Sequence, residues 1–67
     1  MMLITRRDYA KDGDLVSFTL SLSLNNWFYV QRDSKKDGPS IEGIYNKKEL
    51  AEAKFSRIVM YYEDNQR

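Results

Sequence analysis

The sequence predicts a two-layer α+β fold: an antiparallel β-meander of three to four strands, then one C-terminal helix packed on one face (ββββα). Residues 16–24 alternate apolar and hydroxyl side chains, the period-two pattern of a strand with one buried face. Residues 49–62 instead place most of their apolar side chains on one side of a helix. We expect the 67 residues to form a single domain, 1–67.

Polar clusters divide the first two-thirds of the chain into strands. Asp12-Gly13 is a strong tight-turn signal, because Gly adopts positive φ without steric cost. Asn25-Asn26 is a second candidate turn, since Asn tolerates the left-handed region better than other side chains. A third cluster covers residues 34–39. The strands are therefore predicted at about residues 3–9, 15–24, 27–33 and 41–45.

A helix is predicted from about residue 47 to residue 63. Asn46 and Glu49 have the spacing of a capping box, in which each side chain bonds the other residue's backbone N–H. The residues expected on the apolar side of this helix are Leu50, Ala51, Phe55, Ile58, Val59, Tyr61 and Tyr62. Residues 58–62 also have high β propensity, so a shorter helix followed by a last strand is the alternative.

One helix covers only one face of a sheet, so the other face is expected to stay open. If the Asn25-Asn26 turn is a two-residue loop, Trp27 and Tyr29 face the helix. The open face then carries Ile4, Arg6, Ser17, Thr19, Ser21, Phe28, Val30 and Arg32, with Ile41 and Tyr45 if the last hairpin is also even. If the loop is odd, Trp27 and Tyr29 face out while Phe28 and Val30 face in.

The residue types argue against catalysis. The chain has no histidine to activate a hydroxyl nucleophile and no cysteine for a thiolate or disulfide. Residues 8–19 and 33–44 each place Asp and Gly as in a calcium-binding loop, but lack its third and twelfth ligands. We therefore expect no enzyme activity, no metal site and no cofactor.

Charge and hydropathy indicate a soluble protein. The formal net charge is +1 and the sequence pI is about 8.0. Nucleic-acid-binding domains typically have a pI above about 9. No stretch approaches the ~20 apolar residues that a membrane span needs, and the missing cysteine fits a reducing compartment. We expect a cytoplasmic location.

The open sheet face is the predicted binding site, because clustered exposed apolar residues usually mark a contact surface. The predicted partner-binding residues are Arg6, Phe28, Val30, Arg32 and Tyr45. The expected function is that of a small non-catalytic protein-binding module, of the kind that phages and mobile elements encode to inhibit or adapt a larger host complex. A homodimer through the same face is an alternative.

Residues 27–33, Gly38 and residues 45–53 together resemble the arm-type DNA-binding domains of tyrosine recombinases. The similarity consists of an aromatic-rich hairpin, a polar turn and a final strand that leads into a Lys-Lys-x-x-Ala helix. It implies a sheet laid in the DNA major groove. The nucleic-acid contacts carried over by position are Arg32, Lys35, Lys36, Lys47 and Lys48. DNA binding through the open sheet is therefore the alternative function.

Overall fold

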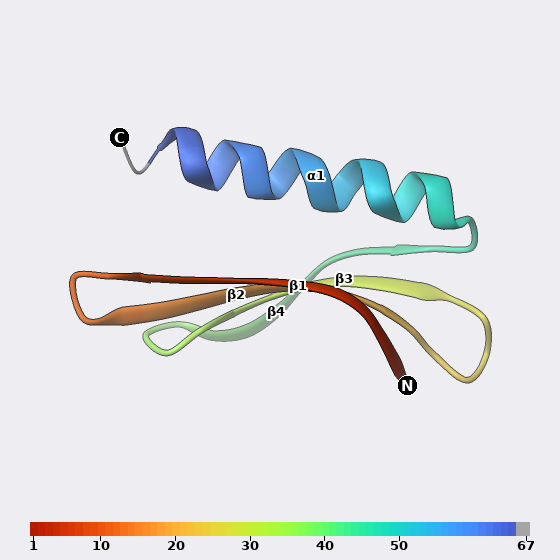
Figure 1. The fold of residues 1–67 in the computed structure, drawn as a ribbon. Coiled ribbons are helices and arrows are strands. Elements are labelled where there is room, and N and C mark those ends of the chain that lie inside the picture. Colours follow the sequence, from red (N-terminus) through yellow and green to blue (C-terminus); the bar gives the residue numbers. More distant parts are fainter. Residues whose placement is uncertain (66–67) are drawn as a thin grey trace.

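The computed structural model describes residues 1–65 and shows four antiparallel strands in one sheet, with a single helix packed on one face (Figure 1). The strand order in the sheet is β1-β2-β3-β4, as in a meander. The elements are β1 Met2–Lys11, β2 Asp14–Leu22, β3 Phe28–Ser34, β4 Gly38–Tyr45 and α1 Lys48–Asp64. The predicted two-layer ββββα fold is confirmed.

The core lies between the sheet and α1. Alternate residues of β2 point toward the helix and are buried, as the period-two pattern predicted. From the helix, the buried residues are spaced four apart, which places them on one stripe. The core residues are Val16, Phe18, Leu20, Val30, Ala51, Phe55 and Val59.

The turn between β1 and β2 is a two-residue turn, as predicted. Lys11 pairs with Asp14, and the two residues between them have positive φ, 52° at Asp12 and 82° at Gly13. Positive φ at both central positions is the type I′ conformation, whose twist matches that of the flanking strands.

The turn between β2 and β3 has an odd number of residues, so the even register expected for this hairpin is wrong and the odd alternative holds. The Ser23 N–H donates to the Trp27 carbonyl at 2.9 Å, so three residues lie in the loop rather than two. The Asn26 N–H donates to the Ser23 carbonyl at 3.1 Å, and Asn26 has φ of 65°. A type I turn followed by a left-handed residue is the usual three-residue hairpin loop. The odd length turns β3 over, so Phe28 and Val30 face the helix.

Two β-bulges move further residues from their expected face. The register of β1 shifts between Leu3 and Thr5, and the extra residue, Ile4, packs against the core instead of lying on the open face. The register of β4 shifts opposite Val30 and Gln31, so Tyr45 also packs against the core. The expectation that Ile4 and Tyr45 lie on the open face was therefore wrong.

The helix forms as one element through residues 58–62, so the alternative of a last strand there is wrong. Its N-cap is Lys47 with no side-chain cap bond, and the predicted Asn46 capping box is absent. Leu50 and Tyr61 were expected on the buried side but are exposed, because the helix buries a narrower stripe than half its surface. No helix within residues 1–65 has the length and apolar character needed to cross a membrane.

The helix crosses the sheet diagonally. It begins directly after β4, and its C-terminal half reaches β1 at the other edge of the sheet. There the Tyr9 hydroxyl donates to the Glu63 carboxylate at 3.0 Å, and the Tyr9 ring lies 5.0 Å from that of Tyr62. Tyr62 also packs edge-on against Phe18, with ring centroids 5.3 Å apart. This aromatic cluster holds the end of the helix over β1 and β2.

Candidate functional site

Within residues 1–65, no other element covers the sheet face opposite the helix (Figure 1). Residues directly opposite each other on neighbouring antiparallel strands point to the same face, so the register identifies its members. Three rows cross this face: Leu3, Ser21, Tyr29 and Ile44; Arg6, Thr19, Gln31 and Ile41; Asp8, Ser17, Asp33 and Pro39. The face is apolar toward the β2–β3 turn and polar toward the other end.

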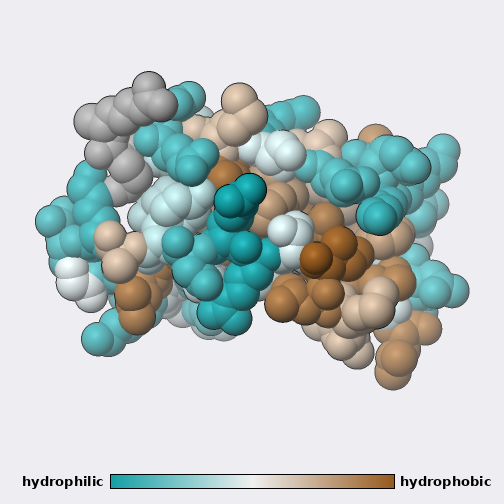
Figure 2. Space-filling model, in the orientation of Figure 1, coloured by the Kyte–Doolittle hydropathy of each residue, from teal (hydrophilic) through white to brown (hydrophobic). Residues whose placement is uncertain are grey.

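The register places Leu3, Tyr29, Ile41 and Ile44 in the apolar half of the open face. Trp27 precedes Tyr29 by two residues, so the alternation of the strand assigns it to the same half. Four of these residues are between 41% and 55% exposed, and Tyr29 is half-buried. Figure 2 shows hydrophobic residues gathered below the sheet near the N-terminus and the β2–β3 turn, whereas the opposite end is mainly hydrophilic. Such a cluster is the usual mark of a contact surface, unlike single exposed apolar residues.

Ser21 lies in the middle of this half and is buried. Its hydroxyl has no hydrogen-bond partner within the described residues. A buried hydroxyl without a partner loses its bonds to water and gains none in the protein. Ser21 is therefore a destabilising group at the centre of the open face.

The polar half carries a closed hydrogen-bond network. The Asp8 carboxylate accepts from Arg6 at 2.8 Å and from the Ser17 hydroxyl at 2.6 Å. The Ser17 bond and the Arg6 guanidinium lower the pKa of Asp8, and the Asp8 carboxylate raises that of Arg6. Asp33 adds a second carboxylate to this half. Arg6 is thus an ion-paired residue and not a free cation.

Of the predicted partner-binding residues, only Arg6 lies on the open face. Val30 is fully buried, Phe28 and Tyr45 pack against the core, and Arg32 lies on the helix side opposite Phe18. The physical reason is the odd β2–β3 loop, together with the β4 bulge in the case of Tyr45. The expectation that Phe28, Val30, Arg32 and Tyr45 lie on the open face was wrong.

The residues that replace them were partly visible in the sequence. Trp27 and Tyr29 belong to the odd-loop alternative, which the positive φ of Asn26 selects. Ile44 shares their face because it pairs directly with Tyr29. Leu3 joins them only through its pairing with Ser21, which no local pattern indicates.

The structure does not bring the predicted nucleic-acid contacts together. Lys35 and Lys36 lie in the β3–β4 turn, and Lys47 and Lys48 follow the far end of β4. Eight strand residues, or about 26 Å, separate the two pairs. None of the four lies within a row of the open face.

Within residues 1–65, no group of three or more acidic side chains is arranged to hold a metal ion. Comparison of the chain with protein-family models, with curated proteins and with solved structures finds no match. The case for a function therefore depends on the chain's own surfaces.

Proposed function

We propose that this protein is a non-catalytic binding module that docks another protein on the apolar half of its open face. The supporting observation is that Leu3, Trp27, Ile41 and Ile44 remain substantially exposed on a sheet face that no other element of the described chain covers. Burying each of these half-exposed side chains under a partner contributes about 1 kcal/mol. The edge next to Arg6 and Asp8 supplies the polar rim that such interfaces have.

Trp27 and Tyr29 are the expected anchors of this contact. Aromatic residues are enriched among the few interface positions that carry most of the binding energy. Both combine a large apolar ring with a polar group, which allows them to be wet before binding and buried afterwards.

The charges on the open face favour a protein partner over nucleic acid. Asp8 and Asp33 place two carboxylates on its polar half, and Arg6 is paired with one of them. A phosphate backbone laid on this face would approach both carboxylates. Affinity that comes from phosphate neutralisation needs unpaired cations, which lie elsewhere on this molecule.

The test compares two charge insertions on the same face. Ile44→Asp places a carboxylate in the apolar half, and Leu15→Asp places one at a similarly exposed apolar residue outside it. Proteins retained by the wild type from cells of its natural source are identified and purified, and their affinity for each variant is measured by calorimetry. We expect Ile44→Asp to weaken binding by about tenfold or more and Leu15→Asp by less than about twofold.

Far-ultraviolet circular dichroism must show that both variants keep the wild-type fold. Equal loss of binding in the two variants, or an unaffected Ile44→Asp variant, would contradict the proposal. Light scattering of the wild type in dilute solution identifies the case in which the occupant is a second copy of the chain.

A further inference from the structure

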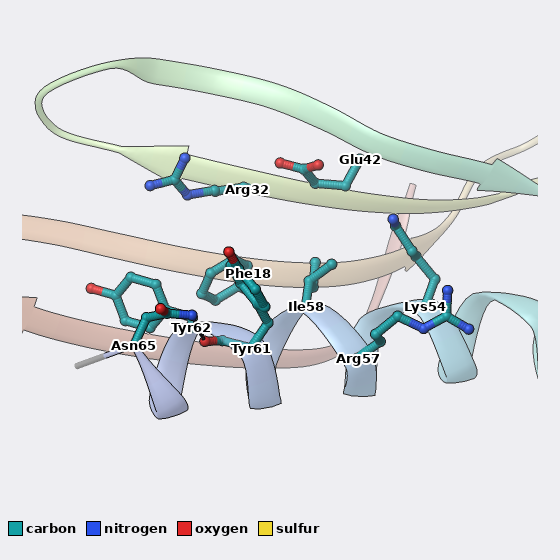
Figure 3. Close-up of a pocket in the computed structure, with 9 residues that line it drawn as sticks. All are labelled: Phe18, Arg32, Glu42, Lys54, Arg57, Ile58, Tyr61, Tyr62 and Asn65. Atoms are coloured by element: carbon teal, nitrogen blue, oxygen red, sulfur yellow. Dashed lines mark hydrogen bonds between the residues drawn. The ribbon is translucent and has the colours of Figure 1, made fainter. Parts of the chain in front are cut away.

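A second surface feature lies on the helix side of the sheet. Because α1 starts beside β4 and ends over β1, its C-terminal half diverges from the β3–β4 hairpin. The wedge between them is a groove with a volume of about 470 Å³ (Figure 3). The diagonal path of the helix, fixed by Tyr9 and Tyr62, therefore creates this groove.

The floor of the groove is apolar and aromatic. Phe18 of β2 and Ile58 and Tyr62 of α1 form it, and Tyr61 stands at its edge with 72% of its surface exposed. Figure 3 shows these side chains between the helix and the strands, pointing into the same space. This floor suits an apolar side chain of a ligand.

Cations stand at both ends of the floor. Arg32 projects from β3 near Tyr62, and Lys54 and Arg57 project from the helix wall one to two turns earlier (Figure 3). None of the three forms an ion pair with another of residues 1–65, in which the one salt bridge joins Arg6 to Asp8. Their charges are therefore available to a ligand.

Among the described residues that line the groove, one carries a carboxylate, Glu42. Within residues 1–65 its hydrogen-bond partner is the Ser40 hydroxyl, which donates to it at 3.3 Å. With Arg32, Lys54 and Arg57, the part of the groove formed by residues 1–65 carries three positive charges and one negative charge. A ligand that complements it has an apolar centre, negative charge on both sides and a donor for Glu42.

We propose that this groove binds an acidic peptide segment of a partner protein. One apolar side chain of the segment packs on Ile58 and Tyr61, and flanking carboxylates pair with Arg32 at one end and with Lys54 and Arg57 at the other. A backbone N–H of the segment donates to Glu42. This site is separate from the apolar half of the open face and does not depend on it.

A peptide fits this groove better than a nucleic-acid strand does. Glu42 lies between Arg32 and the Lys54–Arg57 pair (Figure 3), where it would repel a continuous phosphate backbone. Stacking of successive bases needs several exposed rings, and Tyr61 is the exposed ring here, whereas Phe18 is buried. Paired charges around an apolar centre are instead the pattern of an interface hot spot with a charged rim.

The test uses a five-residue peptide, blocked at both ends, with a central phenylalanine flanked on each side by two glutamates. It is titrated into ¹⁵N-labelled full-length protein, and backbone amide shifts are followed by NMR. We expect saturable shifts concentrated at residues 32, 42 and 54–62. A peptide with a central glycine, and one with glutamines in place of the glutamates, are each expected to bind about tenfold more weakly.

Two double variants, each of which removes two positive charges, distinguish binding in the groove from non-specific attraction to the protein's overall charge. Lys54→Gln with Arg57→Gln is expected to weaken binding about tenfold, and Lys35→Gln with Lys36→Gln less than about twofold. The Ile44→Asp variant is expected to bind the peptide as the wild type does, which keeps this test independent of the open face.

Four results would overturn the proposal. They are the absence of saturable shifts up to about 5 mM peptide, shifts centred on the open face, equal effects of the two double variants, and displacement of the peptide by a lower concentration of oligothymidylate of equal charge.

Discussion

The length of the β2–β3 loop decides which residues of β3 are buried, and deletion of Asn25 tests this directly. The deletion leaves a two-residue loop between Ser23 and Trp27. If β3 responds by slipping one position, Val30 moves from full burial to the open face. Exposing a buried valine costs about 1.5–3 kcal/mol. The same slip turns Asp33 toward the helix, which adds the cost of burying a carboxylate.

The chain can also keep its register and tighten the loop. A two-residue type I′ turn needs positive φ at both central residues, which are then Leu24 and Asn26. Leucine in the left-handed region costs about 1–2 kcal/mol. Either response therefore lowers the free energy of unfolding by at least about 1 kcal/mol. That is a large share of the total, because a core of this size rarely supplies more than about 3–5 kcal/mol.

The matched control is Asn25→Ala, which removes the same side chain and keeps the loop length. It loses the bonds that Asn25 accepts from the Ser23 hydroxyl and the Trp27 N–H, so it is also expected to destabilise the protein. Urea unfolding followed by circular dichroism gives the free energies of both variants. We expect the deletion to cost at least about 1 kcal/mol more than the substitution. Equal costs would refute the role assigned to loop length.

Three further predictions concern single side chains. Tyr9→Phe removes the bond to Glu63 and is expected to cost about 0.5–1 kcal/mol in urea unfolding. Burial, and then the Glu63 carboxylate, raise the pKa of Tyr9 in the folded protein. The neutral Tyr9 side chain therefore makes its full contribution to stability below the ordinary tyrosine pKa, and this contribution is lost as the pH rises through the folded-state pKa. Above about pH 10, the wild type should lose more stability than Tyr9→Phe does. Ser21→Ala removes a buried hydroxyl without a partner, so urea unfolding should show a gain of about 1 kcal/mol, and a loss would show that this hydroxyl is bonded in solution. Ser34→Ala breaks the bonds that the buried Ser34 hydroxyl makes with the Asp14 carboxylate and with two turn N–H groups. We expect the free energy of unfolding to fall by about 1–3 kcal/mol. A fall of less than about 0.5 kcal/mol would contradict this network.

The fold could be predicted because its signals are local. The alternation of residues 16–24 identifies β2 and its buried face without any information from other strands. Asp12-Gly13 specifies a two-residue turn, because both positions accept positive φ. The four-residue spacing of Ala51, Phe55 and Val59 likewise identifies the buried stripe of the helix.

The candidate site could not be predicted to the same degree, because the residues that form it depend on whether the β2–β3 loop has an even or an odd number of residues. Two adjacent Asn residues fit either a two-residue loop or the end of a three-residue loop, and the choice reverses every side chain of β3. The bulge at Ile4 adds one residue without a Gly or Pro to mark it. The bulge at Glu42 is followed directly by Gly43, but a glycine alone does not give the position of a bulge. The groove depends on the angle between helix and sheet, which no pattern in the sequence encodes.

The odd loop is also the arrangement that the polar atoms of β3 favour. In the observed register, Phe28 and Val30 turn apolar side chains to the core, and the inward Ser34 hydroxyl is satisfied by Asp14. The even register would turn the Tyr29 hydroxyl and the Asp33 carboxylate toward the helix, where each needs a partner. Burial of the purely apolar residues therefore leaves the amphipathic aromatic residues of this hairpin on the outside. A side chain that tolerates both water and an apolar neighbour suits a surface that is exposed alone and covered in a complex.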